Sequence, residues 1–145
     1  MRLAAGFSLI EILVVIALVA VLAGMSAPMV SAGMDRYEMI STGQQVTSTI
    51  RSARFQAVAR NTALRVRFDY PATGQYQVVL DSNGTTAIGA MQYLPDGVTF
   101  GASTDVAFDI AGRVTTGAAT IVVTNGNADY DRTTSVSTSG QVQLD

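Results

Sequence analysis

The first 30 residues contain one continuous apolar run. From Phe7 to Val30 the chain has a single charged residue, Glu11. At about 1.5 Å of rise per residue, a helix of this length can cross a hydrocarbon core of about 30 Å. Residues 7–30 are therefore predicted to form a membrane-spanning helix. A cleaved secretory signal peptide is the alternative, but the run is longer than the usual apolar core of such a peptide and contains an acid.

The pattern becomes amphipathic after this run. Small and apolar residues recur at spacings of three or four, which is the period of one helix face. These residues are Ile40, Gly43, Val46, Ile50, Ala53 and Ala57. The spacing predicts a helix over about 33–61. Its small residues indicate close packing against a sheet.

From Leu64 onward the hydrophobic period changes to two. The stretch LRVRFDY alternates apolar and charged residues, and QYQVVL follows after a Pro- and Gly-containing turn, as expected of half-buried strands. Further short strands are predicted at 90–94, 98–100, 105–110, 120–124 and 133–144, separated by turns. The predicted fold class is α+β: a long N-terminal helix, transmembrane in its first half and amphipathic in its second, packed on an antiparallel β-sheet domain over about 64–145.

The composition narrows the chemistry available. The chain contains no Cys, no His and no Lys, so it has no thiol nucleophile, no imidazole base and none of the usual zinc ligands. Catalysis would depend on carboxylates, hydroxyls, amides and Arg alone. We therefore expect no enzymatic activity and no cofactor.

Charge is distributed unevenly along the chain. Residues 1–67 contain seven Arg and three acids, whereas residues 68–145 contain two Arg and eight Asp. Guanidinium groups can contact phosphates, which makes DNA an alternative partner. The candidate DNA-binding residues are Arg51, Arg54, Arg60, Arg65 and Arg67. The acidic second half and the lack of aromatic residues among these arginines count against nucleic acid.

One loop has alternating oxygen-bearing side chains. NGNADYDR places Asn125, Asn127, Asp129 and Asp131 at every second position, and a hard cation such as Ca²⁺ binds oxygen ligands of this kind. The loop lacks the complete twelve-residue calcium pattern, and a hairpin turn built on Asn-Gly explains it equally well. No metal is expected elsewhere.

The N-terminus resembles that of type IV pilins and type II secretion pseudopilins. The shared signature is a short basic leader, Gly6, the aromatic residue Phe7, and Glu11 within the apolar run. The resemblance implies that residues 1–6 form a leader, that a prepilin peptidase cleaves between Gly6 and Phe7, and that the new amine of Phe7 is methylated. It also implies a role for Glu11 in filament assembly. An ionisable residue at the centre of a membrane helix costs about 2.5–3.5 kcal/mol on insertion scales, and the amine of a neighbouring subunit would offset this cost.

The second half of the chain carries a further resemblance. VAFDIAGRV, with Phe108, Gly112 and Arg113, and the final SVSTSGQVQL are similar to the domain of minor pseudopilins of the GspH and FimT type. Those proteins tend to have Gly-Arg-Val near the C-terminus, whereas this chain has Gln141 in place of that arginine. Gly112 and Arg113 also fit a simple turn glycine followed by an exposed strand residue. By this resemblance, residues 31–145 form a periplasmic globular domain of pilin-like fold.

Together the two resemblances imply a minor pseudopilin or minor pilin, a structural subunit of a type II secretion pseudopilus or a type IV pilus. The implied partners are other pilins or pseudopilins, a prepilin peptidase, an inner-membrane assembly platform and membrane lipid. The implied location is the bacterial inner membrane, crossed once, with the N-terminus cytoplasmic and the C-terminal domain periplasmic, before extraction into a filament. A FimT-like DNA-binding minor pilin of natural transformation is the alternative, and the sequence does not separate a secretion, type IV or competence pilus.

Overall fold

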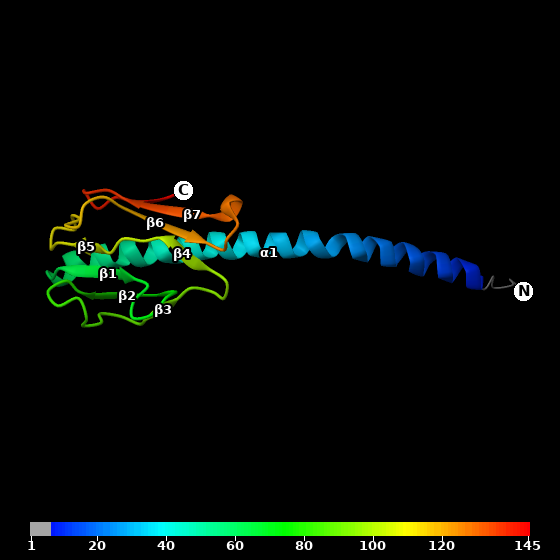
Figure 1. The fold of residues 1–145 in the computed structure, drawn as a ribbon, viewed down its shortest axis with the longest axis horizontal. Coiled ribbons are helices and arrows are strands. Elements are labelled where there is room, and N and C mark those ends of the chain that lie inside the picture. The colour runs from blue at the N-terminus through cyan, green and yellow to red at the C-terminus, as the bar shows by residue number, and fades with distance from the viewer. Residues whose placement is uncertain (1–6) are drawn as a thin grey trace, which may run out of the picture. The chain divides into compact units, whose positions relative to one another are not determined.

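The computed structural model describes the backbone of residues 7–145 and the side chains of residues 7–24 and 32–145. Within this range, one long helix, α1 (Leu9–Arg60), precedes eight strands and a short 3-10 helix, η1 (Ala128–Tyr130) (Figure 1). The chain divides into two compact units, 1–35 and 36–145. Because the boundary falls inside α1, this helix contributes its first part to one unit and its second part to the other.

The predicted membrane segment belongs to the first unit. Among the described residues, no helix is both long enough and apolar enough to cross a membrane. The predicted span 7–30 includes residues 25–30, whose side chains lie outside the described residues, and the predicted leader 1–6 also lies outside them.

The second unit contains two four-stranded antiparallel sheets. The first sheet has the order β3 (Gln92–Tyr93), β2 (Gln75–Leu80), β1 (Leu64–Phe68), β5 (Val106–Phe108). The second has the order β4 (Thr99–Ala102), β6 (Ala119–Thr124), β7 (Arg132–Val136), β8 (Val142–Leu144). All paired neighbours in both sheets run antiparallel. The α+β class predicted from the sequence is confirmed, and the antiparallel strands form two sheets.

The last predicted strand, 133–144, is wrong as a single element, since it contains the β7–β8 hairpin. The N–H of Ser137 donates to the carbonyl of Gln141 (2.9 Å), and the N–H of Gly140 donates to the carbonyl of Ser137 (2.9 Å). Gly140 has a φ of +82°, a conformation that glycine adopts without the steric penalty of other residues. This turn reverses the chain and makes β8 the edge strand of its sheet.

The second part of α1 buries the apolar stripe that the sequence predicted. Five of its six residues are buried, while Ile40 is half-buried, and Met39 joins them. At Gly43 the helix approaches β7 closely: a Cβ built there would lie 2.9 Å from the Cβ of Arg132. The small residues of the stripe therefore permit close contact between helix and sheet.

One hydrophobic core joins this part of α1 to both sheets. In β1, Leu64, Val66 and Phe68 are buried, as the alternation predicted. The ring of Phe68 lies 5.2 Å from that of Phe100 in the other sheet, and Tyr76 lies 5.8 Å from Phe100. Tyr76 is fully buried in this core, and burial raises the pKa of its phenol.

A buried hydroxyl pair connects α1 to β7 and allows a stability test. Thr47 Oγ1 lies 2.8 Å from Thr134 Oγ1, and both residues are buried. Thr47→Val is expected to destabilise the fold by about 1–2 kcal/mol, because the Thr134 hydroxyl then lacks its partner. The double change Thr47→Val with Thr134→Val is expected to recover most of this loss. Urea unfolding of the full chain in detergent measures the free energy of unfolding of each variant. A double variant that is less stable than Thr47→Val would contradict the pairing.

Candidate functional site

The N-terminal candidate residues lie at the start of α1. Phe7 and Ser8 precede the helix, and the carbonyl of Ser8 accepts the N–H of Glu11 (3.0 Å) and of Ile12 (3.2 Å). Glu11 is thus in the first turn, where the positive end of the helix dipole favours a carboxylate. Phe7 is 80% exposed. Gly6, the other residue of the predicted cleavage site, lies outside the described residues.

The first part of α1 exposes apolar side chains in every direction around the helix. The large apolar residues here include Leu9, Ile10, Ile12, Leu13, Val14, Val15, Ile16, Leu18, Val19 and Val21, all exposed. A helix that is apolar all round is stable when lipid or other helices cover it. This surface and Glu11 together form a segment suited to a membrane or to a bundle of like helices.

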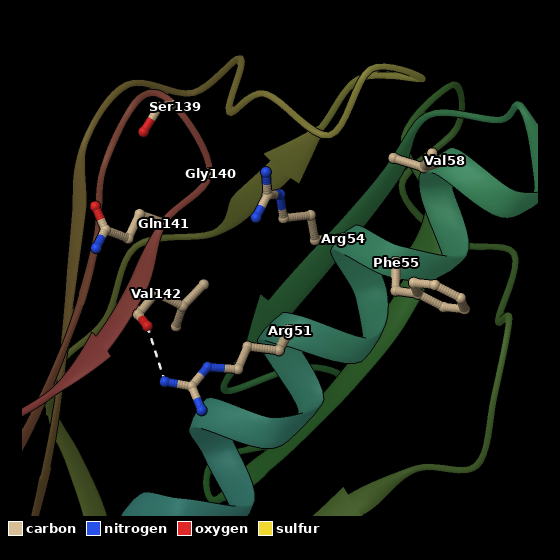
Figure 2. Close-up of a pocket in the computed structure, with 8 residues that line it drawn as sticks. All are labelled: Arg51, Arg54, Phe55, Val58, Ser139, Gly140, Gln141 and Val142. Carbon is tan, nitrogen blue, oxygen red and sulfur yellow. Dashed lines mark hydrogen bonds between the residues drawn. The ribbon is translucent and has the colours of Figure 1, made fainter.

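A second candidate site is a groove between α1 and β8 (Figure 2). Its volume is about 720 Å³. We call it the arginine groove. It is lined by Arg51, Arg54, Phe55 and Val58 of α1 and by Ser139, Gly140, Gln141 and Val142 of the β7–β8 turn and β8. A smaller hollow that also contains Arg51 continues along α1 to Gln44.

Both arginines of this groove are held by backbone carbonyl groups. Arg51 Nη2 donates to the carbonyl of Val142 (2.9 Å), and Arg54 Nε donates to the carbonyl of Gly112 (2.9 Å). In the part of the chain that the structure describes, neither guanidinium forms an ion pair with a carboxylate. Their positive charges and remaining N–H groups are thus available at the groove.

Arg54 also joins two glycine turns that are distant in sequence. Gly112 and Gly140 have φ values of +75° and +82°. A Cβ on Gly140 would collide with the carbonyl oxygen of Gly112 and lie 2.7 Å from Arg54 Nε, while a Cβ on Gly112 would lie 3.0 Å from Val58. The sequence drew attention to the regions of Gly112 and Gly140 separately, but it contains no signal that Arg54, on a helix, contacts both.

Arg113, next to Gly112, stabilises a local turn. Asp109 Oδ1 accepts the backbone N–H groups of Arg113 (2.8 Å) and Ala111 (2.9 Å), and Oδ2 lies 3.3 Å from Arg113 Nε. The backbone N–H of Arg113 is the largest cause that lowers the pKa of Asp109. A lowered pKa means that the folded state favours the charged carboxylate. This contact therefore stabilises the fold at pH values above the ordinary aspartate pKa, and that stabilisation is lost as the pH falls through the lowered pKa.

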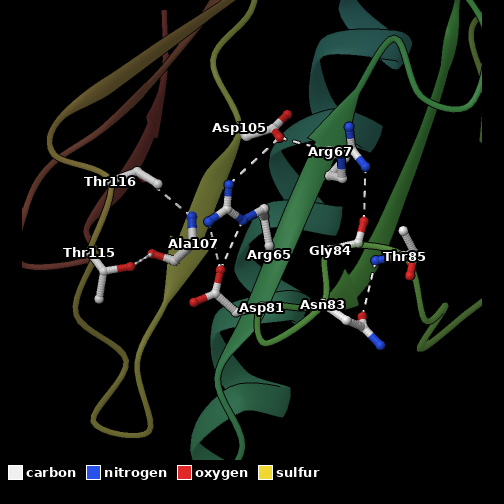
Figure 3. Close-up of polar contacts among 10 residues, drawn as sticks. All are labelled: Arg65, Arg67, Asp81, Asn83, Gly84, Thr85, Asp105, Ala107, Thr115 and Thr116. Atoms are coloured by element: carbon white, nitrogen blue, oxygen red, sulfur yellow. Dashed lines mark hydrogen bonds and ion pairs between the residues drawn. The ribbon is translucent and has the colours of Figure 1, made fainter.

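The other candidate DNA-binding residues lie elsewhere (Figure 3). Arg65 pairs with Asp81 (2.8 Å), and Arg67 lies 3.5 Å from Asp105. Arg67 also donates to the carbonyl of Gly84 and stacks on Tyr70, with 3.6 Å between guanidinium carbon and ring centre.

Arg60 is exposed in the last turn of α1. The five arginines thus divide between the arginine groove, the end of α1 and a carboxylate-paired cluster on β1. The structure does not bring them into one surface.

The predicted calcium loop uses its amide oxygens locally. Asn125 Oδ1 accepts the N–H of Asn127 (3.1 Å), and Asn127 Oδ1 accepts the N–H of Asp129 (3.2 Å), which begins η1. Asp131 follows η1 directly. Among the described residues there is no group of three or more His, Cys, Asp or Glu side chains that could hold a metal ion. These contacts are those of a hairpin loop.

Comparison with known protein families gives two matches. The family described as type II transport protein GspH matches residues 42–140, and the prokaryotic N-terminal methylation motif matches residues 1–27. Each match falls within one of the two units, 1–35 and 36–145. They confirm the two family resemblances that were identified from the N-terminal and C-terminal motifs.

Individual proteins and structures agree with these matches. The type II secretion system protein H of Xanthomonas campestris pv. campestris is 30% identical over 139 residues, covering 83% of this chain and 82% of that protein. The fold is similar to the type IV minor pilin FimU of Pseudomonas aeruginosa (TM-score 0.65, 20% identity, 76% of this chain and 90% of that one). It is also similar to the minor pseudopilin EpsH of the Vibrio cholerae type 2 secretion system (TM-score 0.58, 14% identity, 74% and 95%).

Proposed function

Since the chain belongs to the type II transport protein GspH family, we propose that its N-terminal helix inserts it into a filament, with Glu11 setting the register between subunits. The chain is a minor pseudopilin or minor pilin of a type II secretion system or a type IV pilus. Its relatives are structural subunits, and we propose that this chain likewise supports secretion or pilus assembly without catalysing a reaction.

The exposed apolar surface of α1 is the observation that carries this proposal. Such a surface needs lipid or neighbouring helices around it, and the N-terminal methylation motif covers the same segment. We propose that lipid surrounds the segment in the inner membrane and that other subunits surround it in the filament. The N-terminus would then be cytoplasmic and residues 31–145 periplasmic, as the single charge before the run, Arg2, favours.

Glu11 gives the assembly step its specificity. Cleavage by a prepilin peptidase after Gly6 would create an α-amine on Phe7, four residues before Glu11. When subunits stagger along a filament, the amine of one can approach the carboxylate of the next, and each charge relieves the burial cost of the other. An inner-membrane platform would transfer the subunit from bilayer to filament.

The contacts of two of the five candidate arginines count against the DNA-binding alternative. Arg65 and Arg67 face aspartate side chains, which reduces the positive charge they could offer to phosphates. Assembly of subunits is therefore the function that the site supports best.

The start of the mature chain tests this function. Intact-mass and peptide analysis of the protein from its host is expected to find N-methylated Phe7 as the first residue. Substituting Gly6 with a bulky residue, Gly6→Val, is expected to leave the leader attached and the chain in the membrane. A mature chain that starts elsewhere, or that lacks the methyl group in the wild type, would contradict the proposed processing.

A further inference from the structure

We propose that the arginine groove binds an extended, carboxylate-bearing segment of a different subunit in the same filament. This inference rests on the proposed function, because it requires the chain to be part of an assembly. It concerns the second unit alone and is independent of the Glu11 contact. Charge, shape and exposed apolar surface support it.

The charge of the groove favours a carboxylate. Arg51 and Arg54 are the charged residues that line it, and their carbonyl bonds fix both guanidinium groups before any ligand arrives. Elsewhere in the described chain, Arg65, Arg67 and Arg113 are paired with aspartates. Guanidinium groups bind carboxylates through paired N–H donors. The two fixed guanidinium groups of Arg51 and Arg54, which have no carboxylate partner in the described chain, are therefore complementary to an acidic residue.

The shape of the groove favours an extended segment. Backbone hydrogen bonds join Ser137 to Gln141 and Thr133 to Asp145. Because hydrogen-bonded and non-hydrogen-bonded pairs alternate along antiparallel strands, the N–H and carbonyl of Val142, the residue after Gln141, point away from β7. The carbonyl of Val142 is the group that Arg51 contacts. From Gln44 to Val58 the two hollows follow α1 for about 20 Å, which equals about six residues of extended chain.

The rim of the groove adds an apolar contact. Phe55 is 74% exposed and Val58 50% exposed, and Figure 2 shows both projecting from α1, with the Phe55 ring directed away from β8. Aromatic and arginine side chains together are typical of the residues that contribute most to protein interfaces. An acidic segment with one apolar side chain would use both features.

A different subunit fits better than nucleic acid or a second copy. Single-stranded nucleic acid is bound by tracks of cations with interleaved aromatic rings, whereas this groove has two cations and one ring. A symmetric pair of copies would bring four guanidinium groups face to face. The remaining occupant is an acidic strand from another member of the assembly.

The absence of Cys from the sequence makes a clean crosslinking test possible. Gln141→Cys places one thiol at the β8 edge of the groove, and Thr120→Cys places one at an exposed position on β6. The full chain, expressed in its host, carries a benzophenone maleimide at this thiol. After irradiation, mass spectrometry identifies the crosslinked peptide. The groove probe is expected to link to an Asp- or Glu-containing peptide of another pilin-like subunit, and the β6 probe is not.

Removing one guanidinium tests the charge. Arg51→Gln in the Gln141→Cys background is expected to lower the crosslink about tenfold, since it removes the charge-assisted hydrogen bonds that a guanidinium group donates to a carboxylate. Arg60→Gln, on the same helix but outside the groove, is the matched control and should change it little. Protease resistance of each variant shows that the fold is retained.

Each other outcome overturns the proposal. Crosslinks only to DNA, only to lipid or only to a second copy would identify another occupant, and a yield unaffected by Arg51→Gln would remove the role of charge. Filament content of the probe-bearing chain is measured in parallel. A chain that enters filaments but forms no groove crosslink contradicts the groove alone, whereas a chain absent from filaments contradicts the proposed function as well.

Discussion

Glu11→Ala is expected to lower the amount of this protein in filaments by about tenfold or more, while its amount in the membrane stays unchanged. Glu11 is in the first turn of α1, and the surrounding side chains are apolar and exposed. In the proposed filament these side chains would be covered. In Glu11→Ala the buried Phe7 amine of a neighbouring subunit would therefore lack its carboxylate partner. Breaking a buried ion pair by removing one partner costs about 3–5 kcal/mol.

Two further variants distinguish a defect in subunit register from a defect in membrane insertion. Asp35→Ala removes another exposed acid from α1 and is expected to leave filament content near the wild-type level. Glu11→Gln keeps the size of the side chain and is expected to behave like Glu11→Ala, since the charge is the active feature. Immunoblots of sheared filaments and of membranes provide both measurements. Equal filament content of wild type and Glu11→Ala would refute the pairing.

Gly140→Ala is expected to destabilise the second unit by about 2–4 kcal/mol. The added methyl group would meet the backbone oxygen of Gly112 and the guanidinium of Arg54, neither of which can move without breaking the bond between them. A non-glycine residue at positive φ and an overpacked contact each cost about 1–3 kcal/mol. The melting temperature of the full chain in detergent should fall by about 10 °C or more.

Gly126→Ala is the matched control for this change. Gly126 has a φ of +87°, close to that of Gly140, but nothing lies within 4 Å of the added Cβ. It should therefore show only the backbone penalty, about 1–2 kcal/mol. If both variants lose the same stability, the contact between the two glycine turns has no energetic weight, and Gly140 is a turn residue only.

Much of the fold follows from local patterns. The three- and four-residue spacing of Val46, Ile50 and Ala53 predicted a buried helix face, and α1 ends at Arg60, next to the predicted end at Asn61. The alternation in β1 predicted its buried and half-buried positions. The hairpin within 133–144 was missed because Ser and Thr suit strands and turns alike, so only the hydrogen bonds of Ser137 and Gly140 define the reversal.

The candidate site divides in the same way. Gly6, Phe7 and Glu11 are close in sequence, so their pattern is readable without a structure, and the sequence by itself determined the family, the apolar helix and the alternating strands. Only the tertiary structure decided which arginines are paired with aspartates and which face a groove, and that Arg54 joins Gly112 to Gly140. The reason is physical: periodicity reports which face of an element is buried, whereas contacts between residues 58 positions apart depend on how the sheets pack against the helix.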